Sequence, residues 1–201
     1  MIKEFLTYLT DYFKMNYLIK TDKAIFEIIN GKWHTEWLDF LMPFVRNSQT
    51  WIPMYLFLVL FVLFNFKKNI GWWFLFFALA PILGDLISSG LIKKNIHRLR
   101  PCNDSEMIGH VRFLLGYHPQ SSSFTSSHAT NHFAMAAFFF YTLKPTIKNY
   151  AYLFFVWAAT ICYAQIYVGV HYPIDIVCGA ILGFSIGYFI SLRYNKHFGL
   201  S

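Results

Sequence analysis

The stretch of residues 150–192 reads YAYLFFVWAATICYAQIYVGVHYPIDIVCGAILGFSIGYFISL, and Asp175 is its only acidic residue. It contains no lysine or arginine, and it divides into two long apolar runs, residues 150–168 and 174–192. A helix of about 20 apolar residues crosses the hydrocarbon core of a bilayer. Lipid offers no partner to backbone groups, so such a run spans as a helix. The stretch therefore predicts two membrane-spanning helices joined by a short turn.

Three further segments have the same character. Residues 49–66 carry no charge, residues 70–92 carry only Asp85, and residues 127–143 contain the apolar run FAMAAFFFYTL. Together with the first two, they make five strong predicted spans. We therefore expect an all-α fold, a polytopic membrane helix bundle, with residues 49–201 as a single membrane-embedded domain.

The first 48 residues differ because charges interrupt their apolar residues. Residues 24–45 include Glu27, Lys32 and Asp39. A helix of this kind lies more readily in the membrane interface than across the bilayer. We expect residues 1–48 to form an amphipathic interfacial region, with a sixth span as the alternative.

The composition favours a membrane protein over a nucleic-acid-binding one. Of the 201 residues, 56% are hydrophobic, and the mean hydropathy is +0.41. The net charge of +7 comes from cations that mostly flank apolar runs, an arrangement that suits anionic membrane lipids. Cys102, Cys162 and Cys178 lack the spacing of a zinc site, so we expect free thiols. The oligomeric state is not indicated by the sequence.

The short loops predict the orientation. Their basic residues all fall on one side, namely Lys67, Lys68, Lys144, Lys148, Arg193 and Lys196. The positive-inside rule places that side in the cytoplasm. The loop of residues 93–126 and the turn of residues 169–173 then face outward. The outer loop holds five lysines and arginines, which the rule does not explain and an anion-binding site does.

Three polar clusters fall on this outer side, and the first is KKNIHRLRP, residues 93–101. It contains Lys93, Arg98 and Arg100. A basic collar at the membrane interface would account for these residues. Guanidinium and ammonium groups also bind phosphate oxygens through charge-assisted hydrogen bonds, which makes the cluster a candidate phosphate clamp.

The second cluster is SFTSSHATNHF, residues 123–133, which begins an apolar segment. Ser126 and Ser127 are ordinary residues for a helix cap. The start of a helix also offers free backbone N–H groups and a favourable dipole to an anion. His128 in the first turn would face that anion, whereas His132 is expected to pack against neighbours.

The third cluster holds His171 and Asp175 in the turn between the last two spans. A carboxylate on one ring nitrogen fixes the tautomer and leaves the other nitrogen free to react. An anion clamp, a helix start, two histidines and an aspartate together suit phosphoryl transfer. No further set of Asp, Glu or His residues indicates a dinuclear metal centre, so we expect neither a metal nor a cofactor.

These residues resemble the three motifs of the type 2 phosphatidic acid phosphatase family, K-x6-R-P, P-S-G-H and S-R-x5-H-x3-D. The first motif is intact in residues 93–101. The second corresponds to residues 125–128, Thr-Ser-Ser-His, and the third to residues 164–175, with Gln165 in place of arginine. Order and spacing match throughout residues 93–175.

The resemblance implies a role for each matched residue. His171 would attack phosphorus and become transiently phosphorylated, Asp175 would orient it, and His128 would protonate the leaving oxygen and later activate water. The phosphate oxygens would be held by Lys93, Arg100, Ser126 and the backbone N–H groups of Ser127 and His128. Fixed donors of this kind stabilise the charge of the pentacoordinate state.

Gln165 is the main departure from the motif. Glutamine donates hydrogen bonds but brings no charge, and losing one charge-assisted contact costs about 1.5–3 kcal/mol. Arg98 is the sequence-based candidate to compensate for that charge.

The resemblance implies a lipid phosphatase of the bacterial cytoplasmic membrane, with its site facing the periplasm or the cell exterior. The expected substrate is a lipid phosphate, with undecaprenyl diphosphate ranked first and lipid A phosphate second. A lipid phosphotransferase of the same family is one alternative. A catalytically silent lipid-binding membrane protein is the other.

Overall fold

The computed structural model describes the backbone of residues 2–200 and the side chains of residues 15–200, and every regular element in this part is a helix. The α-helices are α1 (Ile2–Glu27), α2 (Glu36–Arg46), α3 (Ile52–Asn65), α4 (Ile70–Asp85), α5 (Lys93–Asn95), α6 (Ser127–Ile147), α7 (Leu153–Tyr167) and α8 (Pro173–His197). Two π-helical turns follow α1 and α4, at Ile28–Lys32 and Leu86–Ile92. Short 3₁₀ turns occupy Ser48–Trp51, Pro101–Asn103, Ser105–Met107 and Lys148–Tyr152. The predicted all-α fold is confirmed.

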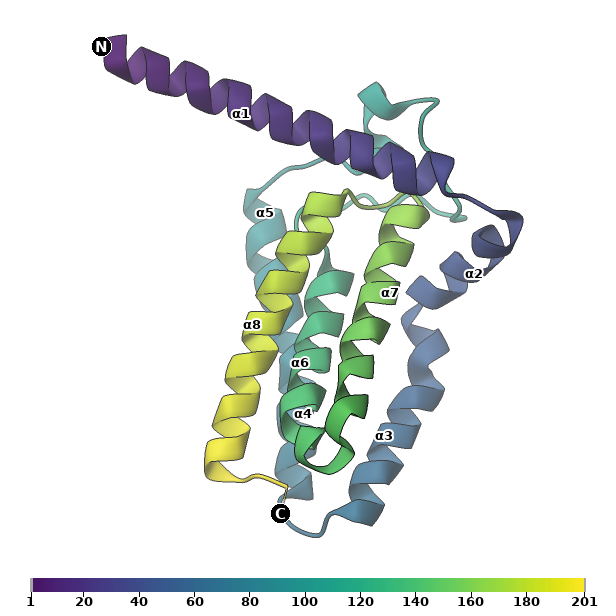
Figure 1. The fold of residues 1–201 in the computed structure, drawn as a ribbon, viewed down its shortest axis with the longest axis vertical. Coiled ribbons are helices and arrows are strands. Elements are labelled where there is room, and N and C mark those ends of the chain that lie inside the picture. The colour runs from purple at the N-terminus through teal and green to yellow at the C-terminus, as the bar shows by residue number, and fades with distance from the viewer. Residues whose placement is uncertain (1, 201) are drawn as a thin grey trace.

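The long helices form a bundle with α1 lying across one end. Figure 1 shows α3, α4, α6, α7 and α8 running along the long axis of the molecule. The α3–α4 turn, the α6–α7 turn and the C-terminus lie at the far end (Figure 1). The long loop after α5 and the α7–α8 turn lie at the α1 end. The segments that carry the three polar clusters therefore gather at one end of the bundle.

In the part of the chain that the structure describes, four segments are long and apolar enough to cross a membrane, by length and composition: Ser48–Asn65, Ile70–Asn95, Ser127–Tyr167 and Pro173–His197. The third contains both α6 and α7, which lie side by side and are joined by a turn (Figure 1). The membrane character is supported, but a count of five or six spans is not confirmed by these segments. Neither α1 nor α2 is among them.

Helices α6 and α8 approach each other closely along a row of glycines. A methyl group at Gly179 would lie 2.7 Å from the Ser126 carbonyl oxygen. At Gly183 and Gly187 it would overlap backbone atoms of α6. Without solvent to drive association in lipid, such backbone contact is a main source of helix–helix attraction. The glycine spacing thus fixes the starts of α6 and α8 next to each other.

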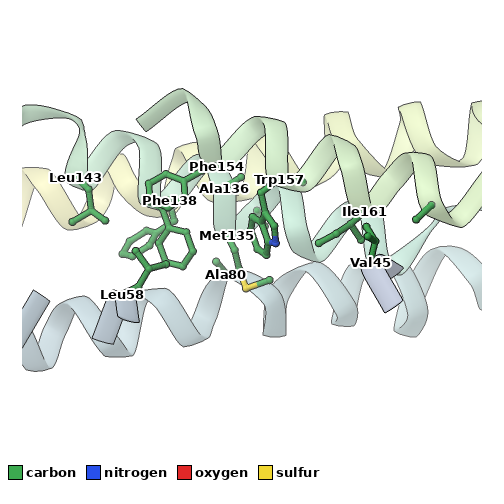
Figure 2. Close-up of a cluster of buried hydrophobic side chains, with 14 of the residues drawn as sticks. Val45, Leu58, Ala80, Met135, Ala136, Phe138, Leu143, Phe154, Trp157 and Ile161 are labelled. Carbon is green, nitrogen blue, oxygen red and sulfur yellow. The ribbon is translucent and has the colours of Figure 1, made fainter. Parts of the chain in front are cut away.

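The apolar core joins the bundle to α2. Figure 2 shows Val45, at the end of α2, and Leu58 of α3 beside buried residues of α6 and α7, including Phe138 and Trp157. Val45 and Trp157 are 8% and 7% exposed, respectively. Because Val45 packs in this core, the next residue of α2, Arg46, lies beside α7.

Hydrogen bonds from the predicted interfacial region, residues 1–48, fix it over the site end of the bundle. The fully buried Asn30 accepts a hydrogen bond from the Arg112 N–H at 2.8 Å and donates one to the Tyr167 carbonyl at 2.7 Å. Asp39 accepts from the Tyr167 hydroxyl at 2.6 Å and pairs with Arg112. These bonds hold α2, the outer loop and the end of α7 in one arrangement.

Candidate active site

His171 lies in the turn between α7 and α8 and is 2% exposed. Its Nε2 is 3.1 Å from Arg100 Nη1, and its Nδ1 is 3.3 Å from Ser123 Oγ and 3.6 Å from Asp175 Oδ2. A guanidinium group only donates hydrogen bonds, so this contact requires Nε2 without a proton. The ring proton is then on Nδ1, and Nε2 carries the lone pair.

The surroundings of His171 keep its ring neutral. Burial lowers the pKa of His171 to about 4, although the nearby carboxylate of Asp175 raises it. The charges of Arg100 and Lys93 lower this pKa further. A neutral imidazole at pH 7 is the form that can act as a nucleophile.

Asp175 stands in the first turn of α8 with its side chain fully buried. The carboxylate accepts hydrogen bonds from the Tyr172 N–H at 2.9 Å, from the Ser123 hydroxyl and from Arg98 Nη1 at 2.6 Å. Ser123 therefore bridges His171 and Asp175, whose direct separation is longer than a hydrogen bond. The start of α8 has Pro173 followed by the acidic Asp175, a combination typical of a helix N-terminus.

Arg98 links Asp175 to the N-terminal helix. Its other terminal nitrogen pairs with Asp22 of α1, and Asp22 also accepts from the Ile174 N–H at 2.8 Å. The guanidinium group contacts two carboxylates, Asp22 and Asp175, rather than Gln165. Arg98 thus holds Asp175 in position, and its charge is balanced within the protein.

Arg100 is 6% exposed and is fixed by neutral groups. It donates to the Ser121 carbonyl at 2.9 Å, to the Ser121 hydroxyl at 3.0 Å and to the Val170 carbonyl at 3.2 Å. Its positive charge therefore remains available next to His171. Lys93, the first residue of α5, is half-buried and close enough to act electrostatically on His171.

The start of α6 is joined to the start of α8. Ser126 caps α6 by accepting a backbone hydrogen bond at 3.3 Å, and its own N–H donates to the Asp175 carbonyl at 3.1 Å. The first backbone N–H groups of an α-helix have no partner within the helix, which leaves those of Ser127 and His128 for an anion. The Ser127 hydroxyl contacts Ser89 at 2.8 Å, on the π-helical extension of α4.

His128 lines a pocket of about 320 Å³ at this end of the bundle. The other lining residues come from α2, the turn after it and the outer loop: Pro43, Arg46, Asn47, Ser48, Leu115 and Tyr117. His132 lies deeper, 3% exposed, with its ring 5.1 Å from that of Trp157, as expected for a packing residue.

Gln165 is fully buried near the end of α7, and its side-chain oxygen accepts a hydrogen bond from Arg46 Nε at 3.3 Å. Arg46, Asp22 and Ser123 are site residues that the sequence reasoning missed. Ser123 belongs to the second polar cluster but was not distinguished from its serine neighbours. Arg46 and Asp22 lie in the region assigned to the interface, where only their charge marked them.

The arrangement contains the groups that phosphoryl transfer needs: a neutral nucleophilic nitrogen, a nearby carboxylate, a second histidine and, within residues 15–200, cations that form no direct ion pair. Within residues 15–200, no group of three or more His, Cys, Asp or Glu side chains is placed to hold a metal ion.

The chain was compared with known protein families and curated proteins. The family model of the PAP2 superfamily matches residues 71–198. The lipid A 4'-phosphatase of Porphyromonas gingivalis is 29% identical over 186 residues, covering 90% of this chain and 75% of that protein. The lipid A 4'-phosphatase of Bacteroides thetaiotaomicron is 30% identical over 172 residues, covering 84% and 75%.

Two solved structures share the fold. The transmembrane PAP2-type phosphatidylglycerolphosphate phosphatase of Bacillus subtilis matches with a TM-score of 0.68 at 21% identity, covering 90% of this chain and 88% of its own. LpxE of Aquifex aeolicus matches with a TM-score of 0.62 at 26% identity, covering 85% and 94%.

Proposed function

The chain belongs to the PAP2 superfamily and is an integral membrane lipid phosphatase, and from this premise we propose that it hydrolyses a phosphate monoester of lipid A through a phosphohistidine on His171. The two curated relatives, both named lipid A 4'-phosphatase, support this substrate. They favour the second-ranked substrate of the sequence analysis over undecaprenyl diphosphate.

The contact between Arg100 and His171 carries the mechanism. It directs the lone pair of Nε2 toward a cation that would also bind a phosphate oxygen, with the two nitrogens 3.1 Å apart. As the substrate phosphate enters, Arg100 transfers its hydrogen bond from Nε2 to that oxygen. The nucleophile and the phosphorus are then brought together by the same residue.

In the first half-reaction, Nε2 of His171 bonds to phosphorus while the bond from phosphorus to the sugar oxygen breaks. Asp175, through its own charge and the Ser123 bridge, stabilises the positive charge that develops on the ring. His128 gives a proton to the leaving oxygen. Lys93, Arg100 and the N–H groups at the start of α6 hold the phosphate oxygens.

In the second half-reaction, water attacks the phosphorus of the phosphohistidine and gives a proton to His128. The bond from phosphorus to Nε2 breaks, inorganic phosphate leaves, and His171 returns to its neutral form. His128 thus donates and accepts one proton per turnover, so its protonation state is restored at the end of the cycle.

We further propose that α3, α4, α6, α7 and α8 make five crossings of the bacterial inner membrane. The site end of the bundle then faces the periplasm, and residues 1–48 lie in the membrane interface on that side. The lysines and arginines of the short loops at the opposite end support this orientation.

An apolar pocket supports a lipid substrate. It has a volume of about 450 Å³, and its walls come from α3, α6 and α7, including Leu58, Phe154 and Trp157. Trp157 contacts His132, whose ring centroid is 6.0 Å from that of His128. An acyl chain in this pocket would place its headgroup toward His128.

Phosphate release by the purified protein tests the proposal. The detergent-solubilised protein is offered lipid A, undecaprenyl diphosphate and phosphatidylglycerophosphate, each with and without EDTA. We expect release from lipid A that EDTA does not reduce, and no release by His171→Ala. His110→Ala, at a histidine that is 63% exposed outside the site, is the matched control and keeps full activity.

Each other outcome has a defined meaning. Faster release from undecaprenyl diphosphate than from lipid A would restore the first-ranked substrate. Transfer of labelled phosphate to a second lipid would identify a phosphotransferase. A lack of release from all three lipids would leave a silent lipid-binding protein. Acid-labile label on wild-type protein, absent from His171→Ala, is expected after rapid quenching, and its absence would argue against the phosphohistidine.

A further inference from the structure

Arg46 is the last residue of α2 and reaches the pocket that His128 lines. The core fixes it there, because its neighbour Val45 is buried. Residue 46 therefore cannot turn away from the end of α7 without loss of that packing. Arg46 is thus a half-buried positive charge that lines the same pocket as His128, and the question is which group balances that charge.

The partners of Arg46 are neutral. Its Nε donates to the Gln165 side-chain oxygen at 3.3 Å, and its Nη1 donates to the Tyr117 hydroxyl at 3.2 Å. Among residues 15–200, no carboxylate lies within ion-pair distance of its guanidinium group. Nη2 has no protein partner in this part of the chain, so its donors remain available.

Two other arginines at this end of the molecule are treated differently. Arg98 pairs with Asp22 and Asp175, and Arg112 pairs with Asp39. A partly buried cation with no anion is unfavourable unless a bound anion balances it. Of these three arginines, Arg46 is the one whose charge is left for a ligand.

We propose that Arg46 binds the phosphate group of the substrate, and that Gln165 and Tyr117 hold its guanidinium group in the pocket beside His128. The inference rests on the proposed phosphatase function and adds a substrate-binding residue to it. The planar guanidinium group suits this role, because it donates several parallel hydrogen bonds to phosphate oxygens.

Gln165 gains an explanation from the same contact. It occupies the position at which the matching sequence motif has arginine, and its only side-chain hydrogen bond within the described residues is with Arg46. The neutral Gln165 on α7 thus contacts the guanidinium group of Arg46 on α2. The positive charge that the motif arginine would bring on α7 is therefore supplied from α2. An arginine at both positions would bring two like charges together.

The positive charge of Arg46 also acts on Arg100, the arginine beside His171. Burial lowers the pKa of Arg100, and the charge of Arg46 lowers it further, while Cys102 and Asp175 oppose the shift. Arg46 and Arg100 therefore act on the same region of space. A phosphate between them would relieve their repulsion.

Binding of inorganic phosphate tests the role of Arg46, because it does not depend on which lipid is the substrate. Dissociation constants are measured by calorimetry on the full-length protein in detergent. We expect Arg46→Ala and Arg46→Gln to weaken binding roughly 10- to 100-fold, the range for loss of a charge-assisted hydrogen bond. Arg46→Lys keeps the charge and should lose less. Arg193→Ala, at an exposed arginine near the other end of α8, is the matched control.

Moving the charge from α2 to α7 provides a second test. Gln165→Arg alone should bind phosphate no more tightly than wild type, because the new guanidinium group repels Arg46. The double variant Arg46→Ala with Gln165→Arg should recover most of the binding lost by Arg46→Ala. Recovery cannot come from a merely structural role of Arg46. Failure to recover would overturn the idea that both positions serve one charge site.

The two proposals fail in different ways. If lipid A is not hydrolysed but Arg46→Ala still weakens phosphate binding, the substrate is wrong and the role of Arg46 stands. If lipid A is hydrolysed and Arg46→Ala, Arg46→Gln and Arg193→Ala all bind phosphate as wild type does, the role of Arg46 is overturned.

Discussion

The two sides of the active site use their arginines in opposite ways. On the α8 side, Arg98 is neutralised by Asp22 and Asp175, and this ion-pair network lies behind His171, the proposed nucleophile. On the α2 side, the partners of Arg46 among residues 15–200 are neutral, and its guanidinium group lines a pocket. A balanced charge holds the protein together, whereas an unbalanced one is available to a ligand. The charge of an arginine and its position in the sequence do not show which of these two roles it has.

The largest expected effect follows from disturbing the support on the α8 side. Asp175→Asn keeps the shape of the side chain but removes the charge that stabilises positive His171. We expect kcat to fall by about 10³–10⁴-fold, as for loss of the orienting carboxylate in a catalytic triad, with a smaller change in KM. Steady-state phosphate release measures both. A fall of less than tenfold would show that Asp175 has no orienting role.

Stability should separate the two arginines. Arg98→Gln leaves the buried carboxylates of Asp22 and Asp175 without a cation, and breaking a buried ion pair costs about 3–5 kcal/mol. Arg46→Gln leaves no carboxylate unpaired, and we expect a loss below about 1 kcal/mol. Unfolding of both variants is followed in the same detergent. An equal loss of unfolding free energy in the two variants would show that Arg98 and Arg46 do not differ in their structural roles.

Ligand stabilisation should depend on the α2 side. Inorganic phosphate at about 100 times its dissociation constant should raise the free energy of unfolding of the wild type by about 2.7 kcal/mol. At the same concentration Arg46→Gln should gain much less. Melting curves with phosphate, and with chloride at matched ionic strength as the control, measure this. An undiminished gain in Arg46→Gln would place the anion elsewhere.

The last expected effect is a shift in titration, which changes neither rate nor phosphate binding. The pKa of His171 lies at about 4 because of burial, against about 6.5 for an ordinary histidine. As pH falls from 6.5 to 4, the unfolded chain takes up this proton and the folded protein does not, so stability decreases over this range. NMR of ¹⁵N-histidine-labelled protein, with His171→Ala for assignment, follows the ring. A midpoint near 6.5 would contradict a buried neutral nucleophile.

The fold could be predicted because its signals are local. Long apolar runs become helices in lipid whatever surrounds them, and Gly179, Gly183 and Gly187 mark the face on which two helices touch. The charged residues that interrupt the apolar residues of 1–48 distinguished that region from the predicted spans. It did not reveal that α1 carries Asp22 into contact with the start of α8.

Residues of one compact motif could be grouped into a candidate site from the sequence, whereas partners far apart in the sequence could not. His171 and Asp175 are four residues apart and meet at the start of one helix. Gln165 and Arg46 are 119 residues apart, and no periodicity relates them. Arg98, a cation of the first polar cluster, was the sequence-based candidate to compensate for the charge missing at Gln165. Its two carboxylate partners direct it elsewhere.

The sequence by itself predicted the all-helical membrane fold, the resemblance to the family and the residues of the proposed reacting centre. These depend on apolar run length and on spacings within one or two helical turns, which survive in any tertiary arrangement. Only the tertiary structure decided which cations are neutralised and which remain for phosphate. That outcome depends on which carboxylates packing brings within ion-pair distance, and packing joined Arg98 to Asp22 while it left Arg46 beside Gln165.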